Sequence, residues 1–355
     1  QKECSELKFS QIKIEENTIC AILQKDLYDY QRYIQLEMTH KKVLAEKILF
    51  EIKAALSSVT NNYEAKIHGS YANNLAVPWS NLDILIISKT EVVSSPEEVE
   101  LLIVQLANKL NSKNWVLKMQ NIKSNVFSVL RIFTSRELGE MRVDINIQSE
   151  QNNDFVKSVQ LINDYLEEFP VLEPLMLALK TILRNANLNI PANGGLSSYG
   201  LLLLVVSFLQ SKLNTEEIAE SDKEILLGKV FHGFLGHYGI YFDYQKYVIL
   251  THLPKKENKV ENQQVERDIN YSQNQHDLVI VDPLNNQNNV ALLSHQFMNL
   301  KMAFMIAYLV SKEDCECGCH YGKAKNENEI FETEHCILKR MFNSAKLFIE
   351  TNFLQ

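Results

Sequence analysis

The sequence predicts a two-part α+β protein, in which a small domain of mixed strands and helices is followed by a mainly helical domain. Strand-like and helical segments are mixed between about residues 45 and 150, and helical patterns dominate after about residue 155. With 355 residues, 46% of them hydrophobic, the chain can form two domains that each have a core. We expect N-terminal helices at 1–45 that pack on the helical domain, a sheet domain at 46–150 and the helical domain at 151–355.

The individual elements follow from the spacing of apolar residues. Residues 25–57 carry apolar residues at every fourth position, between lysines and glutamates, which predicts an amphipathic helix. Strand-like segments lie at 64–69, 82–88, 124–133 and 141–148, and helices are expected at 101–110, 154–169, 174–188, 199–213, 223–239 and 295–312. Polar stretches at 254–277 and 284–289 are typical of solvated loops.

The overall charge and the cysteines limit the class of protein. The formal net charge is −8, so no global positive field attracts nucleic acid, and any RNA contact must use local patches. Six cysteines over this length do not form a secreted disulfide framework. The first residues lack the apolar segment of a signal peptide, and the longest apolar run, residues 201–209, is too short to cross a bilayer. We expect an intracellular protein, in the nucleus or the cytoplasm, that is not in a membrane.

Polar side chains interrupt two of the predicted strands. Asn81 and Asp83 share one face of a strand, because side chains on a strand alternate between its faces, and Asp144 lies on the polar face of another strand. A buried carboxylate needs a cation. That cation is either a divalent metal beside the turn at Gly69 and Ser70, or an Arg or Lys that pairs with an edge-strand carboxylate. Taken alone, these residues favour the ion pair.

The order of these residues resembles the nucleotidyltransferase superfamily of DNA polymerase β, in which Gly-Ser is followed by Asp-x-Asp and a distant third Asp. Within it the chain is similar to the noncanonical poly(A) polymerases and terminal uridylyltransferases. The matching segments are LAVPWSNLDILI at 75–86, FPVLEPLMLALKTILR at 169–184, NGGLSSYGLLLLVVSFLQ at 193–210, LLGKVFHGFLGHYGIYFDY at 226–244 and VDPLNNQNNV at 281–290. The resemblance implies a polymerase-β-like palm, with a mixed sheet and helices, and a mainly helical central (PAP-associated) domain.

The resemblance also implies which residues bind the substrates. Asn81, Asp83 and Asp144 occupy the catalytic positions that hold two Mg²⁺ (or Mn²⁺) ions. The residues in the positions that bind the nucleotide, ATP or UTP, are Gly69, Ser70, Gln148, Lys180, Ser198, Tyr199, Asp282 and Asn288. Plainer interpretations stay open, namely an ordinary tight turn at Gly69, a lysine on a helix surface at Lys180 and a loop at Asp282 that only turns the chain.

The chain departs from the family at the first metal position, where Asn81 replaces an aspartate and removes a negative charge. The replacement is either engineered or natural. Further departures at Asn73-Asn74, Gln148 and Ala291-Leu292 favour natural divergence, because one engineered change would leave these neighbours intact.

Two functions follow from the resemblance. The first is template-independent addition of AMP or UMP to an RNA 3′-hydroxyl, in an RNA-processing or RNA-silencing complex. The second is a catalytically inactive subunit that binds RNA or acts as a scaffold, and Asn81 indicates that the chain is inactive or impaired. For both functions, the acidic net charge predicts that a partner protein, such as a helicase or another polymerase, delivers the RNA. A DNA- or small-molecule-modifying transferase is less well supported, because it would not require the segment GGLSSYG.

A cysteine cluster near the C-terminus has two interpretations. Cys315, Cys317, Cys319 and His320 would form a structural zinc site, or they are reduced surface thiols in an insertion between two helices. Alternate cysteines differ from the usual Cys-x-x-Cys spacing, which favours the thiols.

Overall fold

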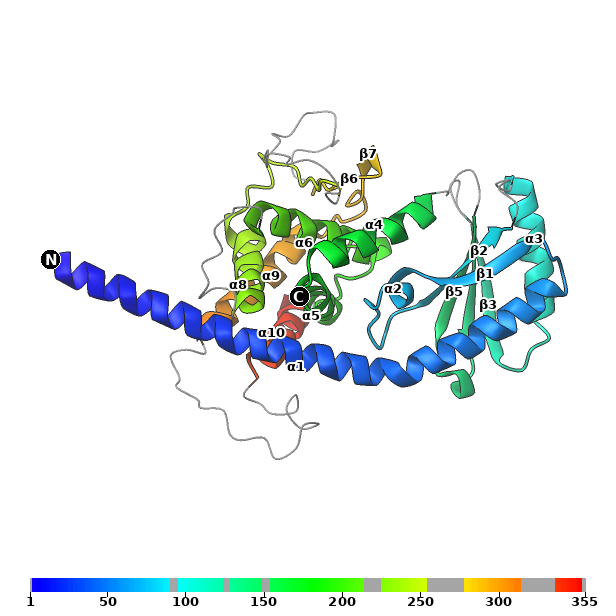
Figure 1. The fold of residues 1–355 in the computed structure, drawn as a ribbon, viewed down its shortest axis with the longest axis horizontal. Helices are drawn as coiled ribbons and strands as arrows, with labels where there is room; N and C mark the ends of the chain where they lie inside the picture. The colour runs from blue at the N-terminus through cyan, green and yellow to red at the C-terminus, as the bar shows by residue number, and fades with distance from the viewer. Residues whose placement is uncertain are drawn as a thin grey trace. The chain divides into compact units, whose positions relative to one another are not determined.

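The computed structural model describes residues 2–89, 95–123, 128–148, 154–213, 225–253, 278–313 and 336–352. The chain divides into two compact units (Figure 1), and we call residues 34–167 the palm unit and residues 1–33 with 168–355 the helical unit. The helix α1 (Lys2–Ser57) is uninterrupted, and its residues belong to both units. The helix expected at 25–57 is therefore the C-terminal part of a longer helix. Within the described residues, no helix is both long and apolar enough to cross a membrane.

The palm unit contains a five-stranded sheet of the order β1-β2-β5-β4-β3. Its strands are β1 (Tyr63–His68), β2 (Leu82–Ser88), β3 (Val116–Lys123), β4 (Ser128–Thr134) and β5 (Arg142–Ile147). β2 and β5 run parallel, and the other neighbours are antiparallel, so the sheet is mixed. The other elements are the short helix α2 (Gly69–Ala72), α3 (Pro96–Leu110), the 3₁₀ turn η1 (Arg136–Leu138) and α4 (Asp154–Glu168).

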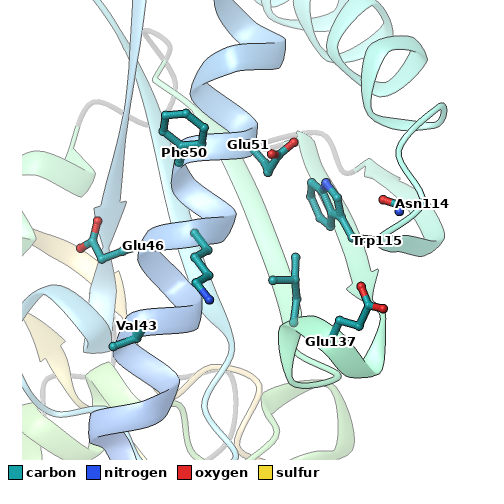
Figure 2. A pocket seen from close by; sticks show the side chains of 9 residues that line it. Val43, Glu46, Phe50, Glu51, Asn114, Trp115 and Glu137 are labelled. Atoms are coloured by element: carbon teal, nitrogen blue, oxygen red, sulfur yellow. The ribbon is translucent and has the colours of Figure 1, made fainter.

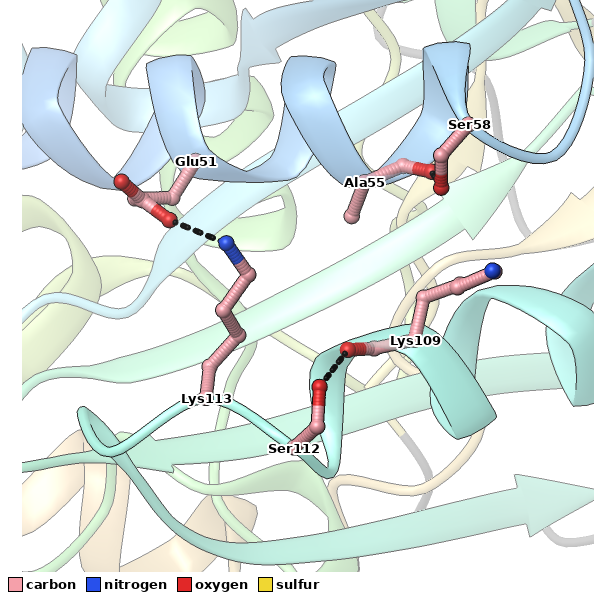
Figure 3. A network of polar contacts seen from close by, with 6 residues as sticks. All are labelled: Glu51, Ala55, Ser58, Lys109, Ser112 and Lys113. Atoms are coloured by element: carbon pink, nitrogen blue, oxygen red, sulfur yellow. Dashed lines mark hydrogen bonds and ion pairs between the residues drawn. The ribbon is translucent and has the colours of Figure 1, made fainter.

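The core of the palm unit lies on the two central strands. Ile84 of β2 and Ile145 of β5 are fully buried and lie opposite each other in the register. α3 packs next to the sheet (Figure 1), and its start is fixed by a capping box in which Ser95 and Glu98 exchange hydrogen bonds. Lys113, in the turn after α3, donates a hydrogen bond of 3.0 Å to Glu51 of α1 (Figure 3), which links the helix to this end of the unit.

The helical unit is built mainly from long helices. They are the N-terminal part of α1, α5 (Leu172–Asn185), α6 (Ser198–Leu213), α8 (Leu226–Gly236), α9 (Phe297–Glu313) and α10 (Ile337–Asn352), with the 3₁₀ turn η2 (Pro191–Asn193) and the π-helix η3 (His237–Tyr241). A two-stranded sheet of β6 (Val281–Asp282) and β7 (Asn285–Asn289) covers most of the second stretch that the sequence indicated as a loop.

Aromatic rings fill the centre of the helical unit. Tyr238 lies within 5.0 Å of Phe234, measured between ring centroids, and its hydroxyl donates to the carbonyl of Leu204. α6 is apolar all around, which is typical of a helix buried on every side. Gly228 allows α8 to approach α1 closely, because an added Cβ would lie 1.8 Å from the carbonyl oxygen of Cys20.

Candidate active site

The register of the two central strands brings the two predicted aspartates together. Asp83 of β2 and Asp144 of β5 are direct partners in the parallel pair. Asn81 lies just before β2, on the same side as Asp83 by the alternation of the chain. Asp144 is 8% exposed, whereas Asn81 and Asp83 are half-buried. The pattern read from the sequence therefore corresponds to one cluster on the central strands of the palm.

A glycine next to this cluster is required by the position of Asp83. Gly69 has φ +61°, and an added Cβ would lie only 2.6 Å from Asp83 Oδ2. Ser70 follows it in α2, and Tyr71, in the same short helix, has a buried hydroxyl without a partner among the described residues. Burial and the charge of Asp83 raise the pKa of Tyr71 to about 12. The Gly-Ser turn thus lies directly beside the carboxylate of Asp83.

Asp144 already has a cation as its partner. Arg131 Nε donates to Asp144 Oδ1 at 2.7 Å, and Arg131 Nη2 donates to Oδ2 at 2.9 Å, so the guanidinium binds both carboxylate oxygens. Arg131 lies opposite Asp144 in the pair of β4 and β5. The hydrogen bond to Asp144 and the charge of Asp83 raise the pKa of Arg131. The amide of Asn81 also donates to Asp144 Oδ2, at 3.4 Å.

Arg131 answers the question that the sequence left open about the compensating cation. The interpretation of Asp144 as a carboxylate paired with an Arg or Lys is confirmed, because Arg131 binds both of its oxygens. The expectation that Asp144 lies on an edge strand is wrong, because β5 lies between β2 and β4. Sequence analysis missed Arg131, and the only signal for it was a basic residue within the apolar strand SVLRIFT.

The residues at this cluster do not fit a pair of divalent metal ions. Two carboxylates and one guanidinium leave one net negative charge, whereas two Mg²⁺ ions bring four positive charges. Both oxygens of Asp144 accept hydrogen bonds from Arg131, and Asn81 supplies no charge.

In the helical unit, two of the predicted nucleotide-binding residues contact a third, Asp282. Tyr199 donates its hydroxyl to Asp282 Oδ1 at 3.0 Å, and the amide of Asn288 donates to Asp282 Oδ2 at 3.1 Å. The backbone N–H of Leu284 also donates to Asp282 Oδ1. Asp282 therefore links the start of α6 to the β6–β7 hairpin. The loop at Asp282 does more than turn the chain, because its carboxylate joins two elements.

The remaining predicted residues differ in burial. Lys180 lies in the middle of α5 and is 7% exposed, so the interpretation as a lysine on a helix surface is wrong. Ser198 is the exposed first residue of α6. Gln148 belongs to the palm unit, directly after β5, where its N–H donates to the carbonyl of Ile86.

The sequence departures are built into the palm unit. Asn73 is buried, and its amide donates to the side chain of Asn163 at 2.6 Å. Asn74 adopts φ +60°, a conformation that asparagine tolerates better than most residues, and it accepts a hydrogen bond from Lys42. In the helical unit, Ala291 is buried and Leu292 is 75% exposed. The contacts of the two asparagines indicate that these departures belong to the stable fold.

The predicted zinc ligands Cys315, Cys317, Cys319 and His320 lie outside the described residues. Within the described part of the chain, no group of three or more His, Cys, Asp or Glu side chains could hold a metal ion. The nearby Cys336 is buried, where its thiol contacts the carboxylate of Asp26 at 3.4 Å. Burial, with the charge of Asp26, raises the pKa of Cys336 to about 12, so this thiol is protonated at neutral pH.

Comparison with known proteins places both units in one family. Residues 23–167 match the central palm domain of mitochondrial-like poly(A) RNA polymerases, and residues 226–288 match the Cid1 family of poly(A) polymerases. The chain is 26% identical to the poly(A) RNA polymerase gld-4 of Caenorhabditis elegans over 80% of the length of this chain. It is also 26% identical to the inactive poly(A) RNA polymerase protein Trf4-2 of Drosophila melanogaster, over 81% of its length and 68% of that protein.

Solved structures share the fold. The polymerase core of TRAMP, an RNA surveillance complex, matches 91% of this chain and 94% of its own with a TM-score of 0.71 and 20% identity. The Cid1 poly(U) polymerase bound to MgATP matches 81% of this chain and 94% of its own, with a TM-score of 0.63 and 19% identity. The chain spans 32% of gld-4 and 44% of the Saccharomyces cerevisiae poly(A) RNA polymerase protein 1. From the two matched domains and these relatives, the chain belongs to the noncanonical poly(A) polymerase and terminal uridylyltransferase family, with its polymerase-β-like palm and PAP-associated domain.

Proposed function

We propose that this chain is a nucleotide- and RNA-binding subunit of an RNA-processing complex, and that its own nucleotidyl transfer is impaired. The observation that carries the proposal is that Arg131 and Asn81 both donate hydrogen bonds to the carboxylate of Asp144. Two-metal catalysis needs carboxylate oxygens that bind dications. Here a guanidinium takes both oxygens of Asp144, an amide stands at the first of the three positions, and Asp83 keeps its carboxylate.

Retained polar contacts support nucleotide binding. Asp83 lies beside Gly69, where the Gly-Ser turn offers backbone N–H groups and the hydroxyl of Ser70 for a triphosphate. In the helical unit, Asp282 orders Tyr199 and Asn288, and Lys180 is a buried cation on α5. We assign the triphosphate of ATP or UTP to the Gly-Ser turn of the palm unit, with a single Mg²⁺ or Mn²⁺ at Asp83.

The partners of the chain are proposed from the same family. The chain resembles the polymerase core of an RNA surveillance complex, and its charge of −8 does not itself attract RNA. A helicase or a second, active polymerase would bring the RNA 3′ end to it, in the nucleus or the cytoplasm.

An active RNA 3′-terminal transferase is the second candidate. The observation that favours it is the register of Asp83 with Asp144, which keeps two of the three acidic positions in place. If Arg131 released Asp144 when nucleotide and Mg²⁺ bind, the RNA 3′-hydroxyl would take AMP or UMP from ATP or UTP, with pyrophosphate as the leaving group.

The experiment that separates the candidates combines extension with binding. We would compare the wild type with Asn81→Asp, Arg131→Met and the double variant, using a labelled RNA oligonucleotide with each NTP and Mg²⁺ or Mn²⁺. Binding of a fluorescent ATP or UTP analogue is measured in parallel. Arg136→Met, which removes an exposed arginine outside the site, is the matched control.

The outcomes are distinct. Nucleotide and RNA binding by the wild type, with extension only after Asn81→Asp and most strongly in the double variant, supports an impaired transferase. Rapid extension by the wild type supports the second candidate. Failure of the wild type to bind both nucleotide and RNA contradicts both candidates.

A further inference from the structure

The palm unit carries a hollow of about 620 Å³ away from the aspartates. Side chains from α1 lie on one side of it, and the segment around Trp115 and η1 forms the other side (Figure 2). Phe50 and Val43 of α1 line it and are 70% and 52% exposed. Large apolar side chains at the mouth of a hollow are typical of a surface that another molecule covers.

The exposed apolar residues of α1 follow a helical repeat. Leu36, Val43 and Phe50 are seven positions apart, and their exposed fractions are 61%, 52% and 70%. Such residues line up along one face of a helix, and His40 and Lys47 lie between them on that face. Other residues of α1, such as Ile48 and Ile52, are fully buried and pack inside the palm unit. α1 therefore has a second apolar face that the described part of the palm leaves open.

This stripe is longer than the hollow. Leu36 does not line the hollow, and it lies 14 residues before Phe50 on α1, which corresponds to about 21 Å along a helix. A small molecule in the hollow would leave Leu36 uncovered. A helix of about four turns would cover the whole stripe.

A buried donor beside the hollow lacks an acceptor among the described residues. Trp115 lines the hollow and is 6% exposed, and its Nε1 has no hydrogen-bond partner among the described residues. A buried N–H without a partner destabilises the folded protein. Because Nε1 itself is buried, a bound segment reaches this N–H only by moving the indole ring, which would change the emission of Trp115.

The charges around the hollow favour a basic occupant. Glu46 and Glu137 lie on opposite sides of it (Figure 2), and neither has a charged partner in the described part of the chain. Glu51 is bound by Lys113 (Figure 3), and among the described residues Lys47 is the one cation that lines the hollow. Excess carboxylates disfavour RNA, and a second copy of this chain would bring the same carboxylates against them.

We propose that this surface, formed by the α1 stripe and the hollow, binds an amphipathic helix of a partner protein. The helix has apolar residues at heptad spacing that pack on Val43 and Phe50, and Lys or Arg on its flanks that face Glu46 and Glu137. This site does not depend on the nucleotide chemistry of the palm.

The test uses a synthetic probe and surface variants of the full chain. The probe is a fluorescent 21-residue helical peptide with Leu at the heptad positions and Lys on both flanks, kept dilute so that it stays monomeric. Two control peptides carry Glu on the flanks, or Ser in place of Leu. Phe50→Glu removes the centre of the site, and Leu101→Glu is the matched control, because Leu101 is a similarly exposed apolar residue on α3 outside the hollow.

Fluorescence anisotropy gives the affinities. We expect the Leu/Lys peptide to bind the wild type and the Leu101→Glu variant equally, and to bind Phe50→Glu at least about tenfold more weakly. Both control peptides should bind at least about tenfold more weakly than the probe. In a Trp79→Phe background, where Trp115 is the one tryptophan left, its emission should change on binding.

Four results would overturn the proposal. They are no binding of the Leu/Lys peptide, equal weakening by Leu101→Glu, equal binding of either control peptide, and an unchanged emission of Trp115. A wild-type dimer in sedimentation that Phe50→Glu dissociates would also overturn it, since the occupant would then be a second copy of this chain.

Discussion

Returning an aspartate to position 81 and removing the guanidinium of Arg131 should make the palm unit depend on a divalent ion. In the Asn81→Asp/Arg131→Met variant, the carboxylate at 81 would lie about as close to Asp144 as the amide does now, at 3.4 Å. Two like charges at this distance repel by about 5 kcal/mol at an effective dielectric constant of 20. Because Asn81 is half-exposed to solvent, we expect about half of this as lost stability in EDTA.

A bound divalent ion should reverse the loss. Mn²⁺ at about 100 times its dissociation constant adds about 2.7 kcal/mol to the free energy of unfolding. For a unit the size of residues 34–167, this raises the Tm by roughly 10 °C. The wild type, whose Arg131 stays bound to Asp144, should shift by no more than about 2 °C.

Thermal unfolding in EDTA and in Mn²⁺, with electron paramagnetic resonance to count bound Mn²⁺, checks this prediction. Arg136→Met is the control for loss of a guanidinium elsewhere in the palm unit. The reasoning fails if the wild type gains as much stability from Mn²⁺ as the double variant. It also fails if the folded double variant binds no Mn²⁺, because the cluster would then lack the geometry for an ion.

Three further outcomes can be measured on stability. Gly69→Ala should lower the free energy of unfolding in denaturant by about 1–3 kcal/mol, because its Cβ would lie 2.6 Å from Asp83 Oδ2 at φ +61°. Gly228→Ala should lower the Tm far more than Gly233→Ala on the same helix, since the nearest atoms to the added Cβ lie at 1.8 and 3.4 Å; equal effects would contradict this. Burial lowers the pKa of His232 from 6.5 to about 4. As the pH falls, the unfolded chain therefore binds a proton at this residue before the folded chain does. The free energy of unfolding is at its full value above pH 6.5 and decreases as the pH falls towards 4. His232→Phe should reduce this fall in Tm, and an unchanged pH dependence would show that other groups cause it.

Much of the palm unit could be predicted from the sequence, because its central strands have a strong pattern. β2 is a nearly continuous apolar run, and β5 alternates polar and apolar residues. β3 (Val116–Lys123) was not predicted, and its burial explains why. All of its side chains are exposed or half-buried, as expected for the strand at the edge of the sheet, so it shows no period of two.

The site could be predicted only in part. Asp83 and Asp144 were found because their spacing follows a known order, but which cation meets them depends on the pairing of β4 with β5. That register places Arg131 opposite Asp144, and one sequence does not reveal it. In the same way, the contact of Tyr199 with Asp282 joins residues 83 positions apart, which no local pattern encodes.

Asn81 and Arg131 both reduce the negative charge of the cluster. Three carboxylates at the end of two strands would repel one another and would need bound metal to be stable. Asn81 removes one of these charges, and Arg131 neutralises another through a bidentate pair. Each of these two residues lowers the affinity for dications and stabilises the metal-free palm, so their effects add. A fold stabilised in this way keeps its shape without metal, which suits a subunit whose work is to bind.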